Sequence, residues 1–105
     1  MDHPINGHEL LKRLQENEKL NLLDVRGEME FHTHNIGGKN IPLPRLRENI
    51  DACGYNKTDE IIVICKVGLR SGTATKLLTE MGYGNARNLT GGLIALQKLK
   101  SKNAI

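Results

Sequence analysis

The residues with the clearest chemical potential lie around Cys65, at the end of an apolar run. Residues 61–64 are β-branched and apolar without interruption, which is typical of a strand buried on both faces of a parallel sheet. Ser71 opens a pattern of apolar residues at helical spacing. A cysteine in this strand–loop–helix order is expected at the carboxyl end of a sheet and the amino end of a helix, a place suited to reactive groups.

A cysteine in that place is expected to react as a thiolate. The pKa of an unperturbed thiol is about 8.5. Loop amides, the helix dipole and the charges of Lys66 and Arg70 should all lower the pKa of Cys65. The alternative is a core residue, since free cysteines are often buried. The position of Cys65 before a cationic loop favours the reactive interpretation.

The rest of the chain supplies the elements that would position this loop. Asn6 and Glu9 are spaced as a helix N-cap and the third residue of a capping box. Strands are predicted at 3–5, 20–25, 40–43, 61–64 and 86–89, and helices at 7–17, at 44–53, from 71 to the glycines at 82 and 84, and after 92. Strands that alternate with helices predict an α/β sandwich around a mostly parallel sheet.

Four segments, in the right order, resemble rhodanese-like sulfurtransferase domains. That family has an active loop of the form Cys-x-x-Gly-x-Arg-Ser, an Asp-Val-Arg segment with an acidic-aromatic run, a His-Ile-Pro-Gly-Ala-x-Asn-Ile-Pro stretch and a closing Asn-Leu-x-Gly-Gly. The similar residues here are 65–71, 22–26 with Glu28, Glu30 and Phe31, 34–43, and 88–93. Two departures are Ile36, where the family usually has proline, and Gln97, near the place of a usual tryptophan.

The resemblance implies a rhodanese-like three-layer sandwich, with a mostly parallel five-stranded sheet and helices on both faces, formed by residues 1–105 as a single domain. Related cell-cycle phosphatases carry five residues between cysteine and arginine, whereas four stand between Cys65 and Arg70. In the family the shorter loop goes with sulfur transfer. A shorter ring of amides also encloses a smaller anion. Phosphatase or arsenate reductase chemistry is therefore disfavoured.

The resemblance also implies roles for individual residues. Cys65 would be the catalytic residue and would carry sulfur as a persulfide. The loop that binds the anionic substrate would consist of Lys66, Val67, Gly68, Leu69, Arg70 and Ser71. Asp24 and Arg26 are candidate supporting residues near the same sheet edge. A carboxylate such as Asp24 more commonly ties neighbouring loops together, and this structural role is favoured for it.

No metal or cofactor is expected. His32 and His34 stand close together, but no cysteine or carboxylate set with zinc-like spacing accompanies them, which favours structural or exposed histidines. Cys53 has two interpretations. It shares a helix face with Leu46 and Ile50, which favours a small buried residue, whereas its place before Gly54 at a helix end would suit a resolving thiol for Cys65.

Composition restricts the partners. The 105 residues carry a net charge of +3, with 26% charged and 38% apolar residues, as in a soluble globular domain. The sequence has no basic stripe interleaved with aromatic residues, so nucleic-acid binding is not expected. No apolar run in the sequence is long enough to span a membrane. Two cysteines do not make a disulfide framework, and no signal pattern opens the chain, so the cytoplasm is the expected location.

The predicted function is transfer of a sulfane sulfur through a Cys65 persulfide. The donor would be a small anion such as thiosulfate or a protein persulfide, and the acceptor a thiol or cyanide. The alternative is a persulfide carrier or docking module that a partner desulfurase loads, without turnover of small donors. The sequence leaves the physiological donor and acceptor, the pathway and the oligomeric state open.

Overall fold

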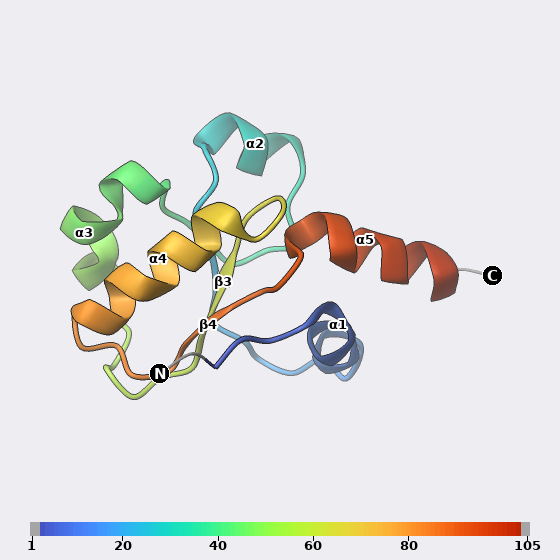
Figure 1. Ribbon diagram of the computed structural model, residues 1–105, viewed down its shortest axis with the longest axis horizontal. Helices are drawn as coiled ribbons and strands as arrows, with labels where there is room; N and C mark the ends of the chain where they lie inside the picture. The colour runs from blue at the N-terminus through green and yellow to red at the C-terminus, as the bar shows by residue number, and fades with distance from the viewer. Residues whose placement is uncertain (1–2, 104–105) are drawn as a thin grey trace.

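The computed structural model describes residues 3–103, in which a parallel sheet lies between two layers of helices (Figure 1). The strand order is β2-β1-β3-β4, and every neighbouring pair is parallel. The strands are β1 (Leu22–Asp24), β2 (Lys39–Asn40), β3 (Ile61–Ile64) and β4 (Ala86–Asn88). The α-helices are α1 (Gly7–Gln15), α2 (Glu28–Thr33), α3 (Leu46–Asn49), α4 (Leu69–Glu80) and α5 (Gly92–Asn103), and the 3-10 turns η1 (Leu43–Arg45) and η2 (Ile50–Cys53) flank α3.

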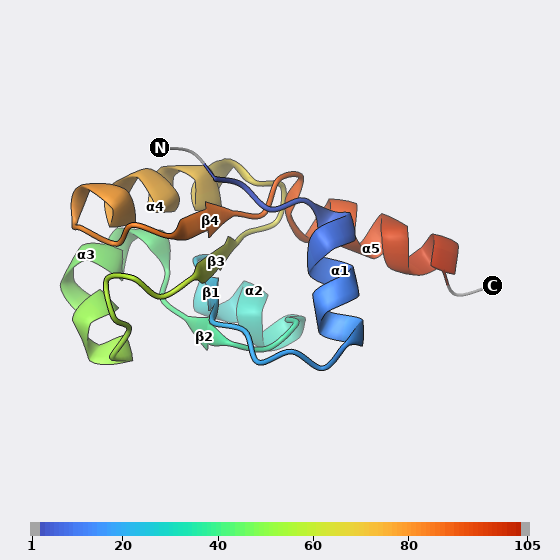
Figure 2. The same cartoon turned by 90° about the horizontal axis from the view of Figure 1, so that it is seen from below.

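The central strand β3 is buried along its whole length and divides the core into two layers. Side chains alternate between the two faces of a strand. Ile61 and Val63 accordingly pack toward α3 and α4, together with Cys65, whereas Ile62 and Ile64 pack toward α1 and α5. Figure 2 shows these two pairs of helices on opposite sides of the sheet. The apolar run of the sequence therefore becomes the strand that both helical layers share.

The sequence-based prediction of a mostly parallel α/β sandwich is confirmed, but the number of strands is wrong. Four strands are formed among residues 3–103, and the expected strand at 3–5 is reduced to one parallel bridge between Ile5 and Leu89. Pro4 has no amide to donate, and Asn6 is already the N-cap of α1, where its side chain accepts from the Glu9 amide at 2.8 Å. Only Ile5 is left to pair with the sheet edge.

Two helix predictions also differ from the structure. The segment 44–53 is a short α-helical turn between two 3-10 turns, so it is not one continuous helix. Helix α4 begins at Leu69, two residues before the predicted start, because Gly68 adopts a left-handed conformation (φ 98°) and serves as its N-cap. This shift places Arg70 and Ser71 inside the first turn of α4. Among the described residues, no helix is long and apolar enough to cross a membrane.

Candidate active site

Cys65 directly follows β3, and the start of α5 forms hydrogen bonds with the backbone of the cysteine loop. The Leu93 amide donates to the Cys65 carbonyl at 3.0 Å, and the Ile94 amide donates to the Lys66 carbonyl at 3.1 Å. A Cβ atom at Gly92 would lie 2.4 Å from the Lys66 carbonyl oxygen, so only glycine allows this approach. The second glycine after Thr90 is therefore explained by the packing of α5 against the cysteine loop.

The Cys65 sulfur accepts hydrogen bonds from the loop and from the first turn of α4. The amides of Gly68 and Ser71 donate to Sγ at 3.1 Å and 3.3 Å. The Ser71 hydroxyl lies 3.2 Å from the same atom. Cys65 itself is fully buried. The loop and the helix terminus thus form a ring of donors around one sulfur atom, as the strand–loop–helix order predicts.

These donors favour the thiolate. Burial acts to raise the pKa of the Cys65 thiol, but hydrogen bonds from the Ser71 hydroxyl and from the amides of Ser71, Gly68 and Val67 outweigh it. The net pKa lies below the ordinary value for cysteine. The cations Lys66 and Arg70 were expected to contribute, but the hydrogen-bond donors make the larger contribution here. A lowered pKa increases the share of the thiolate, which is the nucleophilic form of cysteine.

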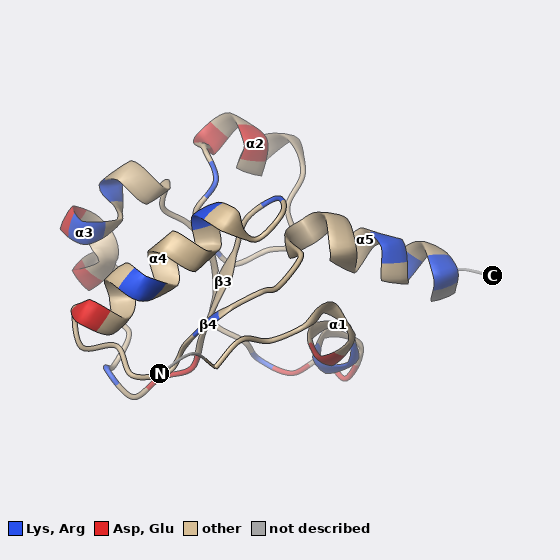
Figure 3. Cartoon of the chain, viewed as in Figure 1, with Lys and Arg blue, Asp and Glu red and all other residues tan. Residues whose placement is uncertain are grey.

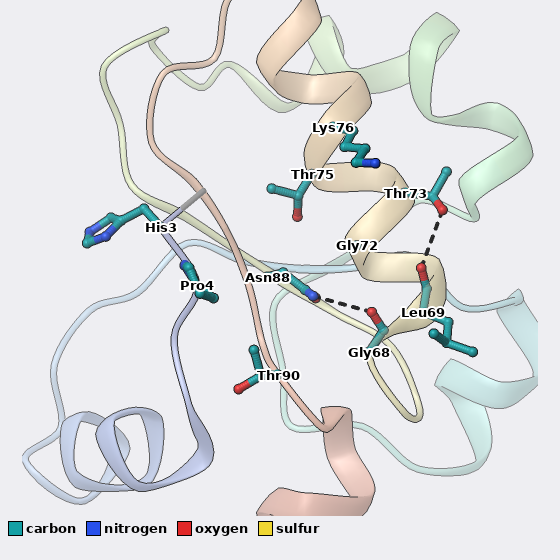
Figure 4. Close-up of a pocket in the computed structure, with 10 residues that line it drawn as sticks. All are labelled: His3, Pro4, Gly68, Leu69, Gly72, Thr73, Thr75, Lys76, Asn88 and Thr90. Carbon is teal, nitrogen blue, oxygen red and sulfur yellow. Dashed lines mark hydrogen bonds between the residues drawn. The ribbon is translucent and has the colours of Figure 1, made fainter. Parts of the chain in front are cut away.

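Asn88 is a site residue that sequence reasoning missed as an individual residue. The Ser71 hydroxyl donates to Asn88 Oδ1. Figure 4 shows the second contact, in which Asn88 Nδ2 donates to the Gly68 carbonyl at 3.3 Å. One side chain therefore orients the hydroxyl beside Sγ and holds Gly68, the N-cap of α4. The available signal was its place as the last residue of β4, at the same sheet edge as Cys65.

Arg70 forms an ion pair with Glu30. Its two terminal nitrogens donate to both carboxylate oxygens of Glu30, at 2.7 Å and 2.9 Å. These hydrogen bonds from Arg70 lower the pKa of Glu30 to about 2, and the pair joins α4 to α2. The guanidinium is therefore balanced by a carboxylate, whereas Lys66 is exposed and forms no ion pair with any described residue.

Two cavities flank the cysteine loop. One, of about 420 Å³, lies between α2 and the start of α5 and is called the α2–α5 cavity; its lining includes Arg26, Met29, Lys66 and Ile94. The other, of about 400 Å³, runs along α4 on the opposite side of Gly68, and its lining includes Asn88 and Lys76 (Figure 4). Small molecules can therefore approach the loop from either side.

The comparison with known proteins decides the family. The model of the rhodanese-like domain matches residues 7–99, which is most of the chain. The chain belongs to the rhodanese-like family. It is 38% identical over 81 residues to the thiosulfate sulfurtransferase PspE of Escherichia coli, with 74% of this chain and 77% of PspE covered. A sulfurtransferase of Allochromatium vinosum is 32% identical over 95 residues, with 90% of this chain and 88% of that protein covered.

Solved structures agree with this assignment. A rhodanese-like domain protein from Staphylococcus aureus superposes with a TM-score of 0.79 at 28% identity, covering 91% of each chain. The predicted family and its α/β fold are thus confirmed. The chain is therefore a rhodanese-type domain of a sulfurtransferase family.

In this rhodanese-like domain, Asp24 and Arg26 are engaged mainly with each other. The Arg26 guanidinium donates to both carboxylate oxygens of Asp24, at distances from 2.8 Å to 3.2 Å, and also to the His34 carbonyl at 2.7 Å. Both residues are buried. Asn40 donates to the carbonyls of Asp24 and Arg26. The pair therefore joins the end of β1 to β2 and to the segment after α2, in agreement with the structural role favoured for Asp24.

The remaining candidate residues lie apart from the sulfur ring. Cys53 and Cys65 are both free thiols, and burial raises the pKa of Cys53, so its thiol is a poor nucleophile at neutral pH. His34 Nε2 lies 3.1 Å from the Gln97 amide nitrogen, so this histidine contacts the residue near the usual tryptophan position. Among residues 3–103, no three His, Cys, Asp or Glu side chains gather in a metal-binding arrangement.

Proposed function

We propose that this domain transfers a sulfane sulfur from a donor such as thiosulfate to a thiophilic acceptor through a persulfide on Cys65. The observation that carries the proposal is the cysteine sulfur at the end of β3, which accepts hydrogen bonds from Gly68 and Ser71 and has a lowered pKa. The family relation supports sulfur transfer as the type of reaction. A reducing compartment such as the cytoplasm would keep this thiol available.

The first half-reaction is a displacement at sulfur. The Cys65 thiolate attacks the outer sulfur of thiosulfate, a sulfur–sulfur bond forms to the enzyme, and the bond inside thiosulfate breaks. Sulfite leaves with the electron pair, and the enzyme keeps a persulfide anion. Lys66 would attract the donor dianion, and the loop amides would hold the negative sulfur in a site poor in water.

The second half-reaction restores the thiolate. Cyanide, or the thiolate of an acceptor, attacks the outer sulfur of the persulfide and takes it, and the bonding electrons return to the Cys65 sulfur. No oxidant or reductant is consumed. In the first step the sulfur–sulfur bond of thiosulfate is replaced by that of the persulfide, and in the second step the persulfide bond breaks as the bond to the acceptor forms. Ser71 and Gly68 would stabilise the returning thiolate through the same hydrogen bonds that they donate in the free enzyme.

The test is intact-protein mass spectrometry after incubation with thiosulfate. We expect the wild type to gain one sulfur atom and to lose it to cyanide, whereas Cys65→Ser gains none and remains folded by circular dichroism. Cys53→Ser is the matched control and should load like the wild type. Sulfur transfer by Cys65→Ser would rule out the mechanism. A wild-type thiol that stays free with thiosulfate, yet is loaded by a desulfurase persulfide, would favour the carrier function.

A further inference from the structure

The exposed large apolar side chains surround the cysteine loop. Among residues 3–103 these are Met29, Val67, Leu69 and Ile94, with exposed fractions of 79%, 50%, 77% and 37%. They come from α2, the loop, the first residue of α4 and the first turn of α5. The packing of the domain itself gives no reason for these four side chains to be exposed around the loop. A cluster of exposed apolar side chains around a reactive group indicates a contact surface for another molecule.

From this apolar ring, formed by Met29, Val67, Leu69 and Ile94, a polar and basic surface continues along α5. The α2–α5 cavity shares Ile94 and Gln97 with a third cavity, of about 470 Å³, which is also lined by Lys98, Ser101 and Lys102. Helix α5 extends away from the body of the molecule, so its outer side is accessible over several turns (Figure 1). We call the combined surface, formed by Met29, Val67, Leu69, Ile94, Lys98 and Lys102, the docking face.

The lysines of α5 give the docking face its unpaired charge. Glu28 and Glu30 stand on either side of Met29, but each forms an ion pair with an arginine inside the domain. Helix α5 carries Lys98, Lys100 and Lys102 and contains no Asp or Glu (Figure 3). No described residue forms an ion pair with these lysines. By contrast, the buried Arg87 is paired with Glu9 and Glu60 within the domain. The lysines of α5 are thus available to an acidic partner.

We propose that the docking face binds an acidic protein that presents a cysteine thiol to the Cys65 persulfide. This rests on the proposed sulfur transfer and names the class of its acceptor. The apolar ring would contact the residues beside the partner's cysteine, and the lysines would steer its acidic surface. The partner thiolate attacks the outer persulfide sulfur, a new persulfide forms on the partner, and the Cys65 thiolate leaves with the electron pair.

Two other occupants fit the surface less well. A second copy of this chain carries the same net charge of +3 and the same α5 lysines, which would repel each other across an interface. A nucleic acid would engage the lysines but would find no aromatic platform for its bases on this face, where the exposed large side chains are Met, Val, Leu and Ile.

The test compares two synthetic acceptor peptides of equal length. Each has a central cysteine between two leucines, with glutamates at the flanks of one and lysines at the flanks of the other. The second-order rate constant for removal of sulfur from persulfidated enzyme is measured by mass spectrometry. The intrinsic reactivity of each peptide thiol toward a neutral disulfide is divided out. We expect the acidic peptide to react about tenfold faster at low salt, with the difference shrinking at high salt.

Charge-reversal variants test whether the α5 lysines cause the preference for the acidic peptide. In Lys98→Glu/Lys102→Glu the acidic peptide should lose its advantage, while transfer to cyanide stays unchanged. The matched control is Lys19→Glu/Arg47→Glu, which makes the same change in net charge at exposed positions before β1 and on α3. This control should keep the preference. Met29→Gln should slow both peptides several-fold without altering cyanide transfer.

Each result has a defined meaning. Equal corrected rates for the two peptides, or loss of the preference in the control pair as well, would overturn the proposal. A dimer in sedimentation velocity that dissociates in Lys98→Glu/Lys102→Glu would assign the face to a second copy. A labelled oligonucleotide that displaces the acidic peptide at equal concentration would assign it to nucleic acid. Absence of any persulfide, or of transfer to cyanide, would instead count against the proposed function itself.

Discussion

At the scale of single residues, the Ser71 hydroxyl is shared between two acceptors. It lies 3.2 Å from Cys65 Sγ and donates to Asn88 Oδ1. The hydroxyl has a single proton, so a neutral thiol can donate to the Ser71 oxygen while the serine donates to Asn88. Once Cys65 is a thiolate, the same proton can turn toward the sulfur. Asn88 therefore offers an acceptor for the states in which Sγ is not anionic, such as the persulfide.

This arrangement makes Ser71→Ala informative. Loss of the hydroxyl removes the strongest donor to the thiolate, so the pKa of Cys65 should rise relative to the wild type. At pH values below the raised pKa, the variant contains less thiolate than the wild type. Alkylation by iodoacetamide at pH 7 should therefore slow roughly tenfold, as expected for the loss of one hydrogen bond to a charged group. The measurement is the pH profile of the alkylation rate, whose midpoint should move to higher pH.

The matched control is Thr73→Ala, an exposed hydroxyl residue on the same helix that donates to the Leu69 carbonyl. Its alkylation profile should coincide with that of the wild type. If Ser71→Ala shows an unshifted midpoint with only a lower plateau, the hydroxyl is a packing group and does not stabilise the thiolate.

At the scale of elements, the sequence predicted the four strands of the sheet and most helices because apolar runs and spacings are local properties. The buried run at 61–64 and the N-cap Asn6 are read from neighbouring residues, and both were placed correctly. The expected capping box with Glu9 is not formed, because the Glu9 carboxylate accepts from Arg87. The start of α4 was wrong. Serine is a favoured N-cap, but Gly68 takes this place because the loop must pass close to the start of α5, a contact that only the tertiary fold creates.

The same reasoning applies to the site. Cys65 and its loop form a continuous segment, so they can be proposed from sequence. Asn88 and Glu30 reach the loop from β4 and α2, and their roles appear only when those elements lie beside α4. The sequence assigned Arg70 to the substrate anion, but it could not show that a carboxylate from α2 faces it.

The pairing of α2 with α4 leads to a prediction for Glu30→Gln. Removing the carboxylate leaves the Arg70 guanidinium without its counter-charge, so the potential at the loop becomes more positive. KM for thiosulfate should fall about two- to fivefold at low salt, and the effect should weaken at high salt. The pair is partly exposed, so the free energy of unfolding should change by less than about 1 kcal/mol.

Glu28→Gln is the control for this prediction. Glu28 is on the same helix and pairs with Arg45 at the surface, so this variant makes an equal change in charge without touching Arg70. A similar fall in KM for Glu28→Gln would show that net charge alone is responsible. A rise in KM for Glu30→Gln would instead show that Arg70 needs the carboxylate to hold its position.

At the scale of the whole molecule, a charge cluster ties together segments that are far apart in the sequence. Glu60, just before β3, accepts from Arg13 of α1 at 2.5 Å and 2.9 Å and from Arg87 of β4 at 2.8 Å. Arg87 also donates to the carbonyls of His3 and Pro4. The cluster lies at the amino edge of the sheet, opposite the cysteine loop, and fastens the N-terminal segment there. It therefore belongs to stability and not to the reaction.

Acid should weaken this cluster in a defined window. Hydrogen bonds from Arg13, opposed by burial, lower the pKa of Glu60 from 4.5 to about 2 in the folded protein. A group with a lowered folded-state pKa stabilises fully above its unfolded value, and the contribution is lost as the pH falls from 4.5 through about 2. Glu60→Gln should lower the free energy of unfolding at pH 7 by about 1 kcal/mol relative to wild type. Because the pKa of a glutamate in an unfolded chain is about 4.3, the difference should be constant above about pH 5 and should shrink toward zero near about pH 2.

Urea unfolding followed by circular dichroism across this pH range would check the window. Glu48→Gln, an exposed position on α3, is the control and should match the wild type throughout. Because Glu30 has a similarly lowered pKa, the wild type and Glu60→Gln should share a common residual loss of stability in acid, and only their difference reports Glu60. A difference that persists unchanged near pH 2 would mean that Glu60 stabilises the fold by packing and not by its charge.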